Sequence, residues 1–198
     1  DTPAFVPVGT QATVKSLTPQ DLREIGVKIF FGNTYHLHLR PGEDIIKNFG
    51  GLAKFMGWSG PTMTDSGGFQ VFSLAKNQVC EESEIPPVVK ITDDGLQFRS
   101  HLDGSKHLFT PEKSIEIQKK LGADIMLAFD QCPPYPCSYE DAQEATDRTH
   151  RWAVRSLKHH NSTFEESLRN TSEVTEGLLR GGLKQALFGI IQGGVYKD

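Results

Sequence analysis

Short apolar runs alternate along this chain with longer segments in which apolar residues recur every three or four positions. Near-continuous apolar runs are typical of strands buried in a parallel sheet, and the longer spacing is typical of helices that cover such a sheet. Five runs are predicted to form strands, at residues 4–8, 27–31, 63–65, 123–129 and 186–191. The pattern therefore predicts an α/β protein built on a parallel sheet.

Capping residues mark where the helices between these strands begin and end. Thr18 and Thr110 each precede a proline, which places a hydroxyl group at the N-cap and a proline at the first helical position. Gly26 and Gly122 follow these two helices and are expected to end them. Further helices are predicted over residues 43–49 and 138–160, and the polar residues 161–185 are predicted to form a helix and loop outside the core.

One segment departs from this alternation of strands and helices. Residues 86–91 and 96–99 have strand-like composition, and they flank Thr92-Asp93-Asp94-Gly95. An Asp-Gly pair accommodates the positive φ of a tight turn. A β-hairpin inserted into the α/β pattern is therefore predicted here.

The composition is that of an ordinary globular domain. The chain has 198 residues, of which 37% are hydrophobic and 23% are charged. It has no apolar run near the roughly 20 residues that span a bilayer, and it does not begin with a basic region followed by an apolar one. Three cysteines do not make a disulfide framework and fit a reducing compartment. These features predict a single domain in the cytoplasm, with no membrane partner.

Charge narrows the function classes only slightly. A net charge of -4 does not suggest a strongly basic nucleic-acid surface, although it does not exclude RNA. Basic side chains recur at three- and four-residue spacing between Arg148 and His160. This spacing is typical of the solvated face of a helix.

Polar side chains follow four of the predicted strands: Asn33, Asp65, Asp130 and Gln192. The loops after the strands form the active site of a (β/α)8 barrel, and a doubly wound sheet also gathers them at one edge. The periodicity alone leaves both architectures open. Neither a Gly-x-Gly-x-x-Gly motif after the first strand nor a phosphate-binding loop motif is present, which disfavours a nucleotide-cofactor fold.

The stretch Thr64-Asp65-Ser66-Gly67-Gly68-Phe69 combines a carboxylate, a hydroxyl group and an aromatic ring within six residues. It reads as a strand ending in a site loop, although Asp, Ser and Gly are also ordinary turn formers. Asp65 and Asp130 suit a general acid and base of the kind glycosidases use, or they only cap helices. A carboxylate near an amide and a ring would also suit a guanine-like base, with Asp130 and Gln192 at its polar edge.

Metal and thiol chemistry find less support. The seven histidines show no helix-spaced metal pattern, and Cys132 and Cys137 supply two ligands where a structural zinc ion needs four. No metal site is therefore predicted within this chain. Cys132 has no identifiable base partner that would make it a nucleophile.

Six separate blocks, in order, resemble the tRNA-guanine transglycosylase (queuine tRNA-ribosyltransferase) family, and together they cover nearly the whole chain. They are Phe5-Val6-Pro7-Val8-Gly9-Thr10-Gln11, Gly32-Asn33-Thr34-Tyr35-His36-Leu37, Leu39-Arg40-Pro41-Gly42, Thr64-Asp65-Ser66-Gly67-Gly68-Phe69-Gln70, Phe129-Asp130-Gln131-Cys132 and Phe188-Gly189-Ile190-Ile191-Gln192-Gly193-Gly194.

The resemblance implies a (β/α)8 TIM-type barrel, of which residues 1–198 would be the N-terminal part of a single catalytic domain. It implies exchange of the guanine at the anticodon wobble position of tRNA for a 7-deazaguanine, through a covalent ribosyl-enzyme intermediate, in queuosine biosynthesis. The Asp-x-Cys pattern at Asp130 and Cys132 looks like the bacterial branch, which uses the aminomethyl base preQ1. A non-catalytic partner subunit of the same family is the alternative.

The same resemblance implies the roles of individual residues. Asp65 matches the family's general acid/base beside the bases. The substrate-binding set comprises Asp65, Ser66, Phe69, Asp130, Cys132, Gln192 and Asn33: Phe69 would stack on the base, Asp130 and Gln192 would read its edge, and Cys132 would lie next to its 7-substituent. Bacterial members often have tyrosine where Phe69 stands.

Family members continue for about as many residues again. The nucleophilic aspartate, the strands that close the barrel and a zinc subdomain with a Cys-x-Cys-x-x-Cys and His pattern are absent from residues 1–198. Zinc is therefore expected in the full-length protein, with its ligands outside this chain, and a homodimer is expected as well. This piece is expected to be inactive alone.

Overall fold

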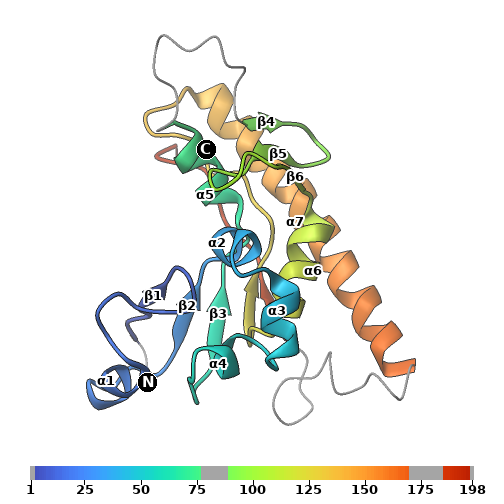
Figure 1. The fold of residues 1–198 in the computed structure, drawn as a ribbon. Helices are drawn as coiled ribbons and strands as arrows, with labels where there is room; N and C mark the ends of the chain where they lie inside the picture. The colour runs from blue at the N-terminus through green and yellow to red at the C-terminus, as the bar shows by residue number, and fades with distance from the viewer. Residues whose placement is uncertain (1–2, 77–88, 170–184, 197–198) are drawn as a thin grey trace.

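The computed structural model describes residues 3–76, 89–169 and 185–196. Five parallel strands form its main sheet in the order β1-β2-β3-β7-β8 (Figure 1). Their bounds are β1 Val8–Gly9, β2 Phe30–Gly32, β3 Thr62–Thr64, β7 Ile125–Leu127 and β8 Ala186–Phe188. The predicted α/β class with a parallel sheet is confirmed, and closure into a barrel stays a prediction.

Helices connect the strands and cover the sheet. They are α1 Pro19–Glu24, α2 Thr34–Leu39, α3 Glu43–Asn48, α4 Leu52–Phe55, α5 Gly68–Lys76, α6 Pro111–Leu121 and α7 Tyr139–Arg169. Helices α2 and α5 follow directly from β2 and β3 and lie beyond the carboxyl ends of these strands, whereas α1 and α4 lie at the opposite end (Figure 1).

The caps predicted from the sequence are present. Thr18 accepts a hydrogen bond from the Asp21 backbone N–H, and the Asp21 carboxylate accepts one from Thr18, which completes a capping box at α1. Thr110 caps α6 in the same way, through the backbone N–H of Lys113. Gly122 ends α6 with a φ of 69°, in the left-handed region that glycine adopts without strain.

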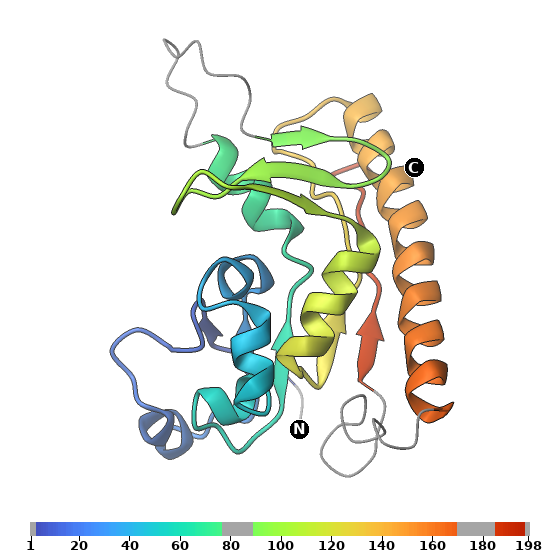
Figure 2. The same cartoon turned by 45° about the vertical axis from the view of Figure 1, so that its right-hand side comes forward.

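The core forms where α6 and α7 pack against each other and on the sheet. Phe129, two residues after β7, is fully buried with its ring centroid 4.8 Å from that of Trp152 on α7. Ile117 and Leu121 of α6 are fully buried as well. Figure 2 shows α7 running alongside α6 and β8. The segment that carries Asp130 therefore begins in the buried core.

A second, antiparallel sheet lies across the carboxyl end of the parallel sheet (Figure 2). It consists of β4 Val89–Ile91, β5 Leu96–Arg99 and β6 Lys106–Phe109. Strands β4 and β5 pair antiparallel around residues 92–95, where the hairpin was predicted. Strand β6 was not predicted, and the first part of the predicted strand 86–91 lies outside the described residues.

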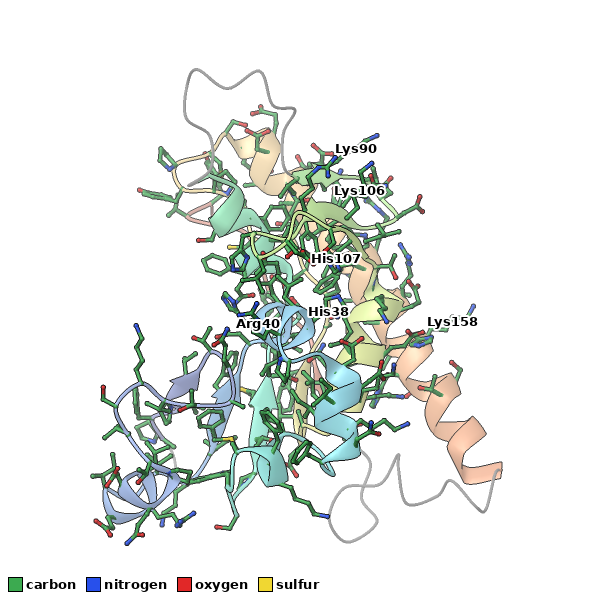
Figure 3. All side chains as sticks on the ribbon, viewed as in Figure 1. His38, Arg40, Lys90, Lys106, His107 and Lys158 are labelled. Carbon is green, nitrogen blue, oxygen red and sulfur yellow. The ribbon has the colours of Figure 1, made fainter. Side chains whose placement is uncertain are left out.

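Histidine and tyrosine side chains connect this second sheet to α2. His38 Nε2 and His107 Nδ1 share a hydrogen bond of 3.1 Å, and Figure 3 shows the two side chains facing each other. Tyr35 Oη and His101 Nδ1 share another of 3.0 Å. His38 Nδ1 also binds Glu43 Oε2 at 2.7 Å. The second sheet is therefore fixed to the helix that starts at Asn33.

Three sequence predictions of secondary structure need correction. The first strand is Val8–Gly9 rather than residues 4–8, because Pro7 has no backbone N–H to donate and only its carbonyl group pairs, with Phe31. Residues 32–36 and the segment directly after Asp65 were predicted as loops, but α2 begins at Thr34 and α5 at Gly68. Polar and glycine residues at the start of both helices conceal the helical pattern.

Candidate active site

Four of the predicted site residues follow consecutive neighbours in the sheet, at its carboxyl edge. Asn33 follows β2, Asp65 follows β3, Asp130 lies three residues after β7, and Gln192 lies four residues after β8. Hydrogen bonds join them in two groups, one around the Asp65 carboxylate and one around the Asp130 carboxylate. Ser66 connects the two groups, since it follows Asp65 in sequence and donates to Asp130.

The Asp65 carboxylate is buried and accepts several hydrogen bonds. Its Oδ2 accepts from Asn33 Nδ2 at 2.6 Å and from Gln70 Nε2 at 2.7 Å. Its Oδ1 accepts from the backbone N–H of Thr34 at 2.7 Å, and Thr34 Oγ1 donates to the Asp65 carbonyl oxygen at 2.6 Å. Asp65 thus accepts a hydrogen bond from the first backbone N–H of α2. The same side chain therefore caps this helix and forms part of the candidate site.

The protonation of Asp65 reflects two opposing effects. Burial raises the pKa of Asp65 above its ordinary value, against the hydrogen bonds from Asn33, Thr34 and Gln70, which favour the ionised form. A buried carboxyl group with a raised pKa takes up and releases a proton closer to neutral pH than a solvated one.

The Asp130 carboxylate has a matching arrangement. Ser66 Oγ donates to Oδ1 at 2.7 Å, and Gln192 Nε2 donates to Oδ2 at 2.8 Å. Burial raises the pKa of Asp130, and the nearby Asp65 charge raises it further, while the bonds from Ser66 and Gln192 lower it. Each carboxylate oxygen keeps acceptor capacity for a ligand, since an ionised carboxylate accepts about four hydrogen bonds.

Glycine allows the loop after Asp65 to approach the loop after β7. A Cβ atom on Gly68 would lie 2.7 Å from the Asp130 backbone oxygen, and Gly67 has a φ of 83°. The Gly68 backbone N–H donates to Ser66 Oγ at 3.2 Å, which orients this hydroxyl group toward Asp130. A side chain at Gly68 would therefore push the two loops apart, and α5 begins at once after this approach.

Phe69 and Cys132 lie outside these hydrogen bonds. The Phe69 ring is 55% exposed on the first turn of α5 and has no ring contact among the described residues. Cys132 Sγ approaches the Pro133 carbonyl oxygen at 3.7 Å. Burial, and then the charge of Asp130, raise the pKa of the Cys132 thiol. A neutral thiol is a poor nucleophile, which agrees with the lack of a base partner in the sequence.

Two glutamines that sequence reasoning missed support the site. Gln70 donates to Asp65 from the next turn. Gln118 is fully buried on α6, and its amide binds the Thr64 hydroxyl group and both the N–H and the C=O of Leu127. It holds the ends of β3 and β7 side by side just before Asp65 and Asp130. The sequence signal that could have identified Gln118 is its position, as a polar residue within the apolar stripe of α6.

No group of three or more metal-binding side chains occurs within residues 3–76, 89–169 and 185–196. No helix in the described part of the chain combines the length and the apolar character that a membrane span requires.

Comparison with known proteins identifies the family of this chain. The family model described as "Queuine tRNA-ribosyltransferase" matches residues 1–198. Proteins of that name from Desulforudis audaxviator and Desulforamulus reducens are 50% and 52% identical over all 198 residues, and one from Natranaerobius thermophilus is 51% identical over 197. The chain spans 45% of the length of each of these relatives. This chain belongs to the queuine tRNA-ribosyltransferase family.

Proposed function

We propose that the full-length protein is a tRNA-guanine transglycosylase, which exchanges the wobble guanine of certain tRNAs for a 7-deazaguanine. The observation that carries the proposal is the pair of carboxylates, buried Asp65 and partly buried Asp130, held at one sheet edge by Asn33, Ser66 and Gln192. The names of the relatives support the same reaction class.

In this proposal Asp130 and Gln192 bind the polar edge of the base. The Asp130 carboxylate accepts hydrogen bonds from the ring N–H and the exocyclic amine, while the Gln192 amide donates to the carbonyl oxygen. Ser66 holds the carboxylate in place through its 2.7 Å bond. The exposed ring of Phe69 provides a surface for stacking, and Cys132, two residues after Asp130, faces the 7-substituent.

Asp65 handles the proton in this proposal. Displacement of guanine leaves a base that must gain a proton, and the incoming base must lose one. A buried acid with a raised pKa suits both transfers. The Asn33 amide and the Thr34 N–H stabilise the ionised form that remains after Asp65 has given its proton to the departing guanine, and this carboxylate then takes the proton of the incoming base.

The remaining parts of the proposal concern the full-length protein. An aspartate outside these residues attacks the ribose C1′ and forms the covalent ribosyl-enzyme, and two successive displacements retain the anomeric configuration. The incoming base is preQ1, a zinc ion is held by residues outside this chain, and the enzyme acts as a homodimer in the cytoplasm. Residues 1–198 alone remain predicted to be inactive.

Incorporation of labelled guanine into tRNA tests the proposal. Full-length protein is incubated with a tRNA carrying guanosine at the wobble position and, as the matched control, with the same tRNA carrying adenosine there. We expect about one label per guanosine tRNA, none in the control, and a denaturation-resistant protein–tRNA complex. Absence of both label and complex would leave a non-catalytic partner subunit as the better assignment.

A further inference from the structure

The backbone around Asp130 is attached to α7 by a stripe of polar side chains. Ser156 Oγ accepts from the Phe129 N–H at 3.3 Å, and Thr149 Oγ1 accepts from the Gln131 N–H at 3.0 Å. Arg148 Nη1 donates to Gln131 Oε1 at 2.5 Å. Gln131 lies between Asp130 and Cys132 in sequence, so α7 fixes the residue that connects them.

The turn between β4 and β5 also accepts hydrogen bonds from side chains of α7. The Asp93 carboxylate oxygen Oδ1 accepts from Arg148 Nε at 3.2 Å and from Arg151 Nη2 at 2.9 Å. The Asp93 carbonyl oxygen accepts from Trp152 Nε1 at 2.8 Å and from Arg155 Nη1 at 2.9 Å. Arg148 does not belong to the solvated face that the spacing indicates, because its side chain is largely buried against this turn, whereas Arg151 binds the turn and stays 51% exposed.

Arg148 is the residue that the two sets of contacts share. Its side chain is only 12% exposed, and it binds Asp93, Gln131 and Glu144 together. An exposed ion pair contributes little, but a guanidinium group that is largely removed from water needs its partners and holds them in a defined geometry. The hairpin turn and the segment after β7 are therefore connected through one planar group.

We propose that Asp93, acting through Arg148 and Gln131, positions Asp130 and Cys132 for binding the free base. This inference rests on the proposed function and adds to it a role for the second sheet, whose turn lies outside the site. Asp93 is a positioning residue: it touches no substrate, and its effect passes through the guanidinium group to the loop that carries the base-binding carboxylate.

Kinetics of the full-length protein test this role, with Asp94→Ala as the matched control. Asp94 is the next residue of the same turn and has no hydrogen bond or ion pair to any described residue. We expect Asp93→Ala to raise the KM for the free base about 3- to 10-fold, the effect of weakening one charged hydrogen bond. The KM for tRNA and the kcat should stay within about 2-fold, and Asp94→Ala should match the wild type.

A double-mutant cycle shows whether the effect passes through Gln131. In a Gln131→Ala background, Asp93→Ala should add less than about 2-fold, because the connection is already broken. The inference would be overturned if Asp93→Ala raised the KM for the base equally in both backgrounds, or if it left this KM unchanged. The proposed function would still stand in either case, provided that the wild-type protein turned over.

Hydrogen exchange gives a second measurement that needs no turnover. The backbone N–H of Gln131 and its neighbours in residues 129–132 should exchange faster in Asp93→Ala than in Asp94→Ala, because their attachment to α7 is loosened. Equal exchange in the two variants would contradict the inference, even if the wild-type protein showed no base exchange and the proposed function failed.

Discussion

Replacing Gln118 by leucine tests how the site's two carboxylates are brought together. Gln118 Oε1 accepts from Thr64 Oγ1 at 2.9 Å and from the Leu127 N–H at 3.1 Å, while Nε2 donates to the Leu127 C=O at 2.9 Å. The amide pairs with Leu127 as the backbone of a neighbouring strand would. Leucine keeps a similar volume and removes all of these bonds, so the change isolates their contribution.

The expected cost follows from the groups left without partners. These are the Thr64 hydroxyl group and the N–H and C=O of Leu127, whereas Ser114 keeps its bond to the Ser66 carbonyl oxygen. Each buried polar group that loses its partner costs about 1–3 kcal/mol. Leu127 is only half-buried, so the lower part of this range applies and the free energy of unfolding should fall by about 3–5 kcal/mol.

Urea unfolding of the full-length protein measures this loss, with Gln20→Leu as the control. Gln20 is exposed on α1 and binds only Glu24, one turn away, so its replacement should change stability by less than about 0.5 kcal/mol. The Gln118→Leu variant should also bind the free base more weakly, because the ends of β3 and β7 separate. A loss below about 1 kcal/mol would refute the reasoning, because it is less than one buried bond is worth.

Two further predictions concern the buried carboxylates. Asp65→Asn should abolish base exchange, since proton transfer is lost, and should leave the protein folded but less stable at neutral pH, because the amide nitrogen cannot accept the hydrogen bonds that one carboxylate oxygen receives. Because burial raises the pKa of Asp65, its contribution to wild-type stability is present below its ordinary pKa and is lost as the pH rises through the folded value, and this loss should be absent from the variant. Retained exchange, or the same pH dependence of stability in both proteins, would count against this account. Glu43 has the opposite behaviour. Burial alone would raise its pKa, but the bond from His38, a backbone hydrogen bond and the charges of His38 and Lys113 together lower the pKa to about 2. Its contribution to stability is therefore present at neutral pH and is lost between about pH 4.5 and 2. Glu43→Gln should therefore lower stability at pH 7 and flatten the pH dependence in that acidic window, and an unchanged acid limb in urea unfolding would exclude this ion pair as its cause.

Much of the framework follows from local signals in the sequence. Thr18 and Thr110 cap helices because the hydroxyl side chain, the proline and the following apolar stripe all indicate the same start. Asn33, Asp65, Asp130 and Gln192 meet because parallel strands end at one edge, so residues far apart in sequence share one direction. Local propensity and strand order were sufficient for these features.

Other features depend on contacts that no local pattern reveals. Helix α5 starts at Gly67-Gly68, which reads as a turn, because the close approach to the Asp130 backbone is visible only in three dimensions. Gln118 is a polar residue on a buried helix face, and its partners come from two strands. Arg148 has the spacing of a solvated residue, and only the position of the Asp93 turn shows that it is paired.

Affinity for the free base tests the central claim most directly. In full-length protein carrying Asp130→Ala, calorimetric titration with a 7-deazaguanine should show binding at least about 10-fold weaker than in the wild type, since a hydrogen bond to a charged group is worth about 1.5–3 kcal/mol. Circular dichroism should show the same fold in both proteins. Wild-type affinity in the folded variant would contradict the assignment of Asp130, Ser66 and Gln192 to a base-binding site.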